Sequence, residues 1–401
     1  MAESSSGSSR TIALSGPGLL FATLMLGQMS QSIAFTAFVA ALPQMARELG
    51  ANGGVVAQMT MALAALGMMV GSIASGWILE KAGTRSTLLA SLLVFAIAGA
   101  GGMFLSEPFS LLASRFVVGF ASACAATTCV WGIAAEYEGT MRARALGISA
   151  AVANFAALGS TLLGGLLAER GGWQLAFAQF PAFGLIGLAL AYASIRQARP
   201  ARERSSQESS SLRPLWPFYG LVIILFAVMF MASTQYAFRL DEAGIDNTAR
   251  RSLFMGAVTV VAAVVSFGYG AVQQRLTVLG TFTVGLVCMA AALAAIGSSS
   301  DPRALATGAA LMGIYVGVLG PYVYHVVTER ADPASRGRAI GMLSAGGFLG
   351  GFLNPVVFAT LSAMFGLRSV FLMVAALMAL MALVTSVQIV RRRTAAAART
   401  A

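Results

Sequence analysis

Long apolar segments alternate with short polar segments along almost the whole sequence. A helix that spans a membrane needs about 20 consecutive, mostly apolar residues. Twelve segments meet this requirement, and Pro, Gly and acidic residues fall in the breaks between them. We therefore predict an all-α integral membrane protein with 12 transmembrane helices. They cover residues 18–42, 55–79, 86–105, 109–135, 145–167, 173–195, 215–238, 253–272, 278–297, 304–328, 339–364 and 369–390.

The second half of the sequence repeats features of the first half at a constant offset of 194 residues. The repeated pairs are Gly76 and Gly270, Glu80 and Gln274, Lys81 and Arg275, Gly119 and Gly313, Arg142 and Arg336, Arg144 and Arg338, Gly147 and Gly341, and Phe177 and Phe371. A single offset across so many positions indicates a duplicated unit of six helices. Two such units have the same orientation, which predicts a parallel 6+6 repeat about an axis along the membrane normal.

The repeat divides the chain into five parts. Residues 18–195 and 215–390 form the two six-helix halves. Residues 196–214, rich in Arg, Ser, Glu and Pro, are predicted to be a flexible linker between them. Residues 1–17 and 391–401 are the terminal tails.

The composition agrees with a membrane protein and excludes a soluble one. Hydrophobic residues make up 58% of the chain and charged residues 10%, and the mean hydropathy is +0.80. A soluble domain carries about 25% charged residues. The three cysteines lie inside apolar segments, which argues against a disulfide framework or a metal site. No nucleophile–base pair or phosphate-binding loop is recognisable, so we expect no cofactor and no enzyme activity.

The distribution of positive charge predicts the orientation in the membrane. With the N-terminus in the cytoplasm, eighteen of the 26 Lys and Arg residues fall on the inner side and seven on the outer side. Cytoplasmic loops carry the excess of Lys and Arg. Both termini are therefore expected in the cytoplasm, and the net charge of +11 reflects topology rather than a nucleic-acid partner.

Three local patterns resemble the major facilitator superfamily. The turn after the second apolar segment, from Gly76 to Arg85, resembles the loop signature Gly-x-x-x-Asp-Arg-x-Gly-Arg, with Glu80 in place of the Asp and Lys81 in place of the first Arg. Arg115-x-x-x-Gly119 is similar to the buried Arg motif of the proton-driven branches. The third pattern is the pair of basic loops that end at Gly147 and Gly341.

The stretch from Ala331 to Pro355 looks most like the bacterial drug:proton antiporter branch, including sugar-efflux permeases. The resemblance implies the major facilitator fold, alternating access between two halves, and a bacterial inner (plasma) membrane. It also implies that the Gly76–Arg85 loop stabilises the outward-facing state. In that reading the loop is a conformational motif made of Gly76, Glu80, Lys81, Gly83 and Arg85. The alternative is that it acts only as a positively charged inner loop.

Arg115 is the one charged residue expected inside a membrane span. An Arg at the bilayer centre costs about 3 kcal/mol or more, so it is a candidate for proton or substrate binding. Gly119 lies one turn further along the same helix face. Alternatively, Arg115 hydrogen-bonds backbone carbonyls and only braces helices.

No Asp or Glu lies in the middle of a predicted span, which favours a neutral or anionic substrate over a cationic one. Coupling or inner-gate roles are assigned to residues near the inner ends of the spans. These are Glu136, Arg142, Arg144, His325, Glu329, Arg336 and Arg338. Histidine is the residue type best suited to proton exchange, which makes His325 a coupling candidate, although a lone His at a span end is commonly just an interfacial residue.

Uncharged polar and aromatic residues within the spans mark a possible cavity, because polar groups avoid lipid and face inward. Hydrogen bonds between helices would explain each of them equally well. These cavity candidates are Gln28, Gln31, Phe35, Asn154, Gln235, Tyr236, Tyr315 and Asn354.

The sequence thus predicts a monomeric secondary transporter in the lipid bilayer. Its expected task is proton-coupled efflux of a small neutral or anionic compound by an antiporter mechanism. One alternative is a proton-coupled importer of an organic anion, with Arg115 as the counter-ion. A membrane sensor or scaffold without transport is the alternative from another class.

Overall fold

The computed structural model describes residues 17–50, 52–105, 107–195, 213–332 and 335–400. Within these ranges the protein is helical and contains no β-strand. Most of the predicted N-terminal tail and most of the predicted linker lie outside the described residues, and α1 begins at the last residue of the predicted tail, Pro17. The first-half helices are α1 (Pro17–Thr36), η1 (Val39–Ala41), α2 (Leu42–Glu48), α3 (Gly53–Ala82), α4 (Thr84–Phe104), α5 (Pro108–Glu136), α6 (Gly139–Ala176) and α7 (Gln179–Ser194).

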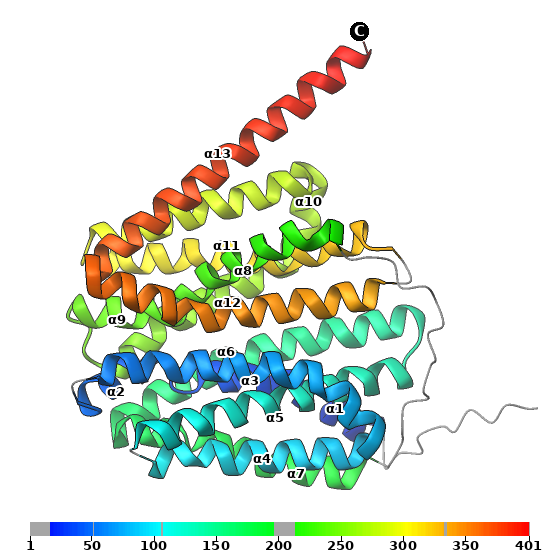
Figure 1. Ribbon diagram of the computed structural model, residues 1–401, viewed down its shortest axis with the longest axis vertical. Coiled ribbons are helices and arrows are strands. Elements are labelled where there is room, and N and C mark those ends of the chain that lie inside the picture. The colour runs from blue at the N-terminus through cyan, green and yellow to red at the C-terminus, as the bar shows by residue number, and fades with distance from the viewer. Residues whose placement is uncertain (1–16, 51, 106, 196–212, 333–334, 401) are drawn as a thin grey trace, which may run out of the picture.

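The second half has a similar succession of elements, with one long helix in place of two and an additional short 3-10 helix at its start. Its elements are η2 (Arg213–Leu215), α8 (Trp216–Met229), η3 (Phe230–Ala232), α9 (Gln235–Glu242), α10 (Thr248–Ser298), α11 (Pro302–Arg330), α12 (Arg336–Phe365) and α13 (Leu367–Thr400). In Figure 1 the first half, blue to green, occupies the lower part of the bundle, and the second half occupies the upper part. The halves meet where α3 packs against α12 and α6 against α10.

These elements make twelve membrane crossings. The first crossing combines α1, η1 and α2, and the seventh combines α8, η3 and α9. The 51-residue helix α10 contains two crossings, because Thr277 within it has non-helical φ and ψ of 67° and 164°. Nine helices in the described ranges are long and apolar enough to span a membrane with α10 counted once, and α7 and α8 are shorter apolar helices. The predicted all-α, twelve-helix architecture is confirmed.

The backbone repeats with the same offset as the sequence. Gly50 and Gly244 have φ of 80° and 82°, and Gly172 and Gly366 have φ of 76° and 81°. The turn between the second and third crossings also has a positive φ in both halves, at Gly83 in the first half and at Thr277 in the second. The duplication therefore preserves the turns that reverse the chain.

Small residues let the helices inside each half approach closely. A Cβ at Gly119 of α5 would collide with the carbonyl oxygen of Ala64 in α3, and one at Gly67 of α3 would collide with that of Phe116. In the second half, a Cβ at Gly313 of α11 would lie 2.7 Å from the carbonyl oxygen of Val258 in α10. Close backbone contact through small residues is the usual way helices pack in membranes. Gly119 thus has a packing role within the first half.

Candidate functional site

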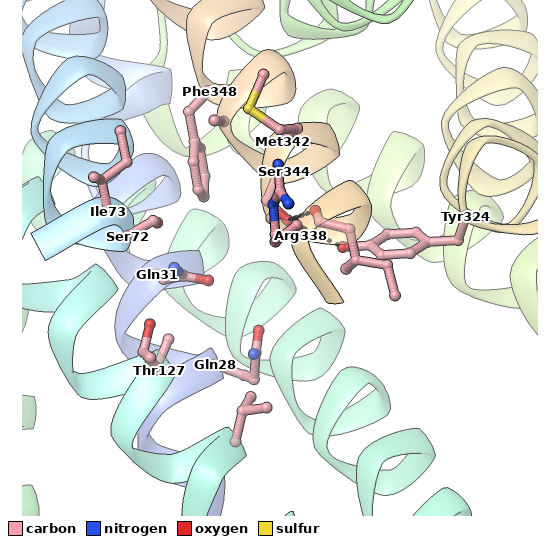
Figure 2. A pocket seen from close by; sticks show the side chains of 15 residues that line it. Gln28, Gln31, Ser72, Ile73, Thr127, Tyr324, Arg338, Met342, Ser344 and Phe348 are labelled. Carbon is pink, nitrogen blue, oxygen red and sulfur yellow. Dashed lines mark hydrogen bonds between the residues drawn. The ribbon is translucent and has the colours of Figure 1, made fainter. Parts of the chain in front are cut away.

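A cavity of about 770 Å³ opens between the two halves, beside the second half of α1 and the start of α12. We call it the vestibule. Gln28 and Gln31 of α1 lie on one side, and Tyr324 of α11 and Arg338 of α12 lie on the other (Figure 2). Arg338 is exposed and is the one charged residue among those that line the vestibule.

A second cavity of about 270 Å³, which we call the chamber, lies deeper between the halves. Two broken helices border it, because α1 ends at Thr36 and α8 ends at Met229. The aromatic rings of Phe35 and Phe230, one from each half, lie 5.1 Å apart at its wall. Asn154 of α6 also lines this cavity. Interrupted helices near the membrane centre are a common feature of transporter binding sites.

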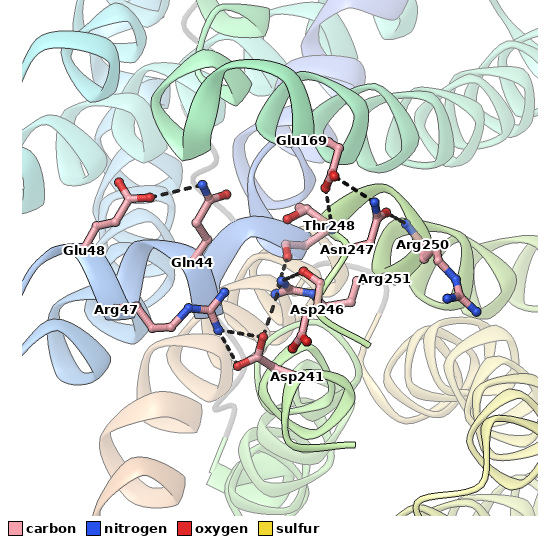
Figure 3. Close-up of polar contacts among 11 residues, drawn as sticks. Gln44, Arg47, Glu48, Glu169, Asp241, Asp246, Asn247, Thr248, Arg250 and Arg251 are labelled. Carbon is pink, nitrogen blue, oxygen red and sulfur yellow. Dashed lines mark hydrogen bonds and ion pairs between the residues drawn. The ribbon is translucent and has the colours of Figure 1, made fainter. Parts of the chain in front are cut away.

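The opposite end of the bundle is closed by ion pairs between the halves (Figure 3). Arg47 of α2 donates two hydrogen bonds to Asp241 of α9, at 2.8 and 2.7 Å. Arg251 of α10 lies 3.4 Å from the same carboxylate and donates a hydrogen bond to the carbonyl oxygen of Ala40, 3.1 Å away. We call Arg47, Asp241 and Arg251 the clasp. Arg251 is fully buried, so the clasp includes one charge that solvent cannot screen.

Further polar contacts join the halves around the clasp. Glu169 of α6 accepts hydrogen bonds from the side chain of Asn247, at 2.8 Å, and from the backbone of Thr248, at 3.0 Å. Closer to the chamber, Gln235 of α9 donates to Gln58 of α3 at 2.8 Å. The chain is therefore closed at the clasp end and open at the vestibule end.

The structure places Arg115 away from both cavities, inside the first half. It is fully buried, with its guanidinium 4.7 Å from the centre of the Phe177 ring, 4.6 Å from that of Phe180 and 5.6 Å from that of Phe38. Its one hydrogen bond, to the carbonyl oxygen of Gly99, is long at 3.5 Å. Two of its three nitrogens find no partner among the described residues. The expectation that Arg115 supplies the charge of the cavity does not fit this conformation.

Four of the eight cavity candidates line cavities: Gln28 and Gln31 in the vestibule, and Phe35 and Asn154 in the chamber. Three others are fully buried and brace helices instead. Tyr236 donates to the carbonyl oxygen of Leu305, Tyr315 to that of Leu225 and Asn354 to that of Ala227. Polar groups in apolar surroundings need a partner, and these three find it in the backbone of a neighbouring helix. Gln235 bridges the halves through Gln58.

Comparisons with known proteins decide the family. The model of the Major Facilitator Superfamily matches residues 24–282 and 252–400, which together cover most of the chain. The chain belongs to the major facilitator superfamily. No curated protein matches its sequence.

Solved structures of transporters share this fold. A mutant of the nucleoside transporter NupG superposes with a TM-score of 0.75 at 12% identity, over 92% of this chain and 99% of that chain. A bacterial homologue of the human lysosomal transporter Spinster, in an inward-facing and unoccupied conformation, has a TM-score of 0.74 at 16% identity, over 93% and 98%. The inward-open xylose transporter XylE from E. coli has a TM-score of 0.68 at 14% identity, over 90% and 95%. At these identities the likeness concerns the fold alone.

The predicted loop motif, Gly76 to Arg85, joins α3 to α4. Gly83 ends α3 and precedes α4 with φ of 78°, a conformation that side chains other than Gly rarely adopt. Arg85 lies 4.9 Å from the ring centre of Tyr192 in α7 and donates a 3.4 Å hydrogen bond to its carbonyl oxygen. Lys81 lies 4.0 Å from the ring centre of Trp77, and Gly76 and Glu80 are exposed. These contacts stay within the first half.

The predicted inner-gate residues form no ion pair between the two halves among the described side chains in this conformation. Arg142 and Arg144 are exposed and Glu136 is partly buried, and none of them forms an ion pair with another described residue. His325 and Glu329 lie 3.2 Å apart, without hydrogen-bond geometry, on the same helix. Arg338 lines the vestibule, whereas the side chain of Arg336 lies outside the described part of the structure. The separation agrees with an open vestibule end.

The clasp residues were not predicted as functional. Asp241 and Arg251 resemble ordinary loop charges in the sequence, because they stand at the ends of spans among Glu242, Asp246 and Arg250. One signal was available, since Arg47 and Asp241 are separated by the repeat offset of 194 residues. Equivalent residues near the axis of a two-fold repeat face each other. Opposite charges at such a pair therefore indicate a contact between the halves.

Proposed function

We propose that this chain is a secondary transporter that exports a small neutral or anionic organic compound in exchange for protons. The observation that supports this most is the asymmetry of the space between the halves. One end is held together by the clasp, and the other opens into the vestibule and chamber. Alternating access requires an interface that can close at either end. The superfamily fold and its transporter neighbours support the same function.

The charge distribution supports an orientation with the vestibule facing the cytoplasm of a bacterium. The Arg-rich loops, with Lys81, Arg142 and Arg338, lie at the vestibule end. Positively charged loops remain in the cytoplasm. The conformation is then inward-facing, and both chain termini are cytoplasmic. A cytoplasmic compound would enter through the vestibule and leave after the clasp opens.

The lining of the cavities supports the class of substrate. Neither cavity has a carboxylate among its lining residues, so a cationic compound would find no counter-charge. Moving a cation out of water without a counter-charge costs much free energy. For proton coupling, His325 and Glu329 remain the candidates, because they lie 3.2 Å apart on α11, the helix that contributes Tyr324 to the vestibule wall.

Import of an organic anion is a second candidate function, and one observation favours it. Arg338 rather than Arg115 presents its charge to the open cavity. An Arg can bind a carboxylate or phosphate through two parallel hydrogen bonds. The direction of transport would then be set by the gradients.

Purified protein in proteoliposomes tests both candidates. Neutral, anionic and cationic compounds would be offered under an imposed pH gradient of either sign. Export predicts accumulation of a neutral or anionic compound that is driven by an opposite flow of protons. Uptake in the direction of the proton flow would favour import instead. Lack of any gradient-driven flux, with the fold intact by circular dichroism, would remove transport and support the sensor or scaffold alternative.

A further inference from the structure

The chamber differs from the vestibule in the chemistry of its walls. None of its lining residues carries a charge. An ion inside it would lose its hydration without gaining a counter-charge, which is costly in a low-dielectric environment. The chamber is therefore suited to an uncharged compound.

Four polar side chains of the chamber have unused hydrogen-bonding capacity. Ser32, Asn154, Ser233 and Thr259 form no side-chain hydrogen bond with another described residue. Their neighbours Thr36 and Thr161 by contrast satisfy their hydroxyls within their own helices, at the carbonyl oxygens of Ser32 and Ala157. A polar group in a membrane protein normally has a partner. The four free groups come from both halves and require water or a ligand.

The apolar part of the wall is aromatic and sulfur-rich. Phe35 and Phe230 are tilted by 47° at the point where the two broken helices meet. Met229 and Met255 lie beside them in the lining. Aromatic rings pack well against other planar rings, and Met adapts its shape to them. This wall matches a flat aromatic surface better than a flexible sugar-like one.

We propose that the chamber binds an uncharged, planar aromatic compound whose polar substituents hydrogen-bond Asn154 and Thr259 while its ring packs on Phe35 and Phe230. This inference rests on the proposed transport function and narrows its substrate class from neutral or anionic to neutral and aromatic. Both halves contribute contacts, so binding bridges them. A compound that bridges the halves at the chamber can bias the equilibrium between the inward-facing and outward-facing states.

A matched set of probes tests the proposal in nanodiscs without any gradient. Naphthalene carboxamide, carboxylate and amidinium share one shape and differ in charge, and the fully saturated carboxamide lacks the aromatic ring. The fluorescence of naphthalene reports binding of the first three, and the saturated compound is measured as a competitor. The neutral aromatic amide should bind about tenfold or more tightly than either ion, because one ill-matched buried polar group has an effect of that order. The saturated amide should compete weakly.

Variants locate the binding to the chamber. Thr259→Val keeps the side-chain volume and should weaken amide binding about fivefold to tenfold, through the loss of one hydrogen bond. Phe230→Leu should weaken it while reducing the preference over the saturated amide. Thr360→Val is the matched control, because Thr360 is exposed on α12 and bonds only to its own helix, at the carbonyl oxygen of Val356. It should leave the affinity unchanged.

Three results would overturn the proposal: equal binding of the amide and an ion, an unchanged affinity in both chamber variants, or no binding by any of the probes. The transport assay separates this failure from that of the proposed function. Gradient-driven flux of an ion would overturn the chamber proposal and leave transport standing. Tight binding of the amide without gradient-driven flux of any compound would overturn the transport function and leave the chamber proposal standing.

Discussion

Arg47 and Asp241 occupy equivalent positions in the two halves, 194 residues apart, and form an ion pair with each other at 2.7 Å. A residue close to the axis of a two-fold repeat meets its own equivalent across that axis. Because the two positions carry opposite charges, this contact across the axis is attractive. Arg251 then adds a second positive charge to the same carboxylate.

The geometry of the clasp predicts that its members contribute unequally to the stability of the closed outer end. Arg47 is 53% exposed, and an exposed ion pair contributes only about 0.2–1 kcal/mol. Removal of the carboxylate instead leaves Arg251 buried without its ion-pair partner, and breaking a buried pair costs about 3–5 kcal/mol. Asp241→Asn should therefore destabilise the closed clasp far more than Arg47→Gln does.

Labelling of the chamber from outside measures this effect. A Ser233→Cys variant provides the thiol, and a membrane-impermeant reagent is added to intact cells. Arg47→Gln should raise the labelling rate by at most about fivefold, the equivalent of about 1 kcal/mol, and Asp241→Asn should raise it more. Equal labelling rates in all of these proteins would show that the clasp does not hold the outer end closed.

Arg115 should be required for activity rather than for stability. Two of its nitrogens lack a partner among the described residues. Because unpaired buried donors lose their hydrogen bonds to water, this guanidinium lowers the stability of the folded protein. An apolar residue of similar length removes that cost, since replacing poorly satisfied buried charges by apolar groups is often neutral or stabilising. We expect Arg115→Met to unfold at the same temperature as the wild type or higher, and to lose transport.

Thermal unfolding in detergent and flux in proteoliposomes distinguish the possibilities for Arg115. A large fall in the unfolding temperature would indicate that the contacts with Phe177, Phe180 and Gly99 brace the helices. Arg115→Lys is the informative companion, because Lys keeps the charge but not the planar fork of donors. A stable and fully active Arg115→Met protein would remove Arg115 from the mechanism.

The sequence predicted the helices well because lipid imposes a simple rule on composition, and all twelve predicted spans correspond to helical crossings. It did not locate the breaks at Thr36 and Met229, since the apolar pattern continues across both. It also did not place Arg115. A helix face of small and polar residues is compatible with a cavity or with a neighbouring helix, and only the packing of Phe38, Phe177 and Phe180 distinguishes the two.

The orientation is tested by labelling at two exposed sites. Glu242 lies at the clasp end and Arg142 at the vestibule end, and both side chains are exposed. If the Lys and Arg distribution sets the topology, Glu242→Cys should react with an impermeant thiol reagent in intact cells and Arg142→Cys should not. Opening the cells should make Arg142→Cys reactive. The opposite pattern would invert the orientation and make this conformation outward-facing.

The turn between the second and third crossings differs between the halves, with Gly83 in the first and Thr277 in the second. Thr277 has φ of 67° and ψ of 164°, a region occupied almost only by Gly, and such a residue is strained by about 1–3 kcal/mol. Its hydroxyl accepts a hydrogen bond from the backbone of Gly280 at 3.2 Å, but a Gly at a helix N-cap costs only a few tenths of a kcal/mol. Relief of strain should outweigh the lost cap, so Thr277→Gly should raise the unfolding temperature.

The reciprocal change, Gly83→Thr, is the matched control, because Gly83 holds nearly the same conformation, with φ of 78° and ψ of 169°. It should lower the unfolding temperature by an amount similar to the gain at Thr277. It should also reduce transport more than Thr277→Gly does, if the loop that contains Arg85 regulates the conformational equilibrium. A fall in stability on Thr277→Gly would mean that the Gly280 contact outweighs the strain of the turn.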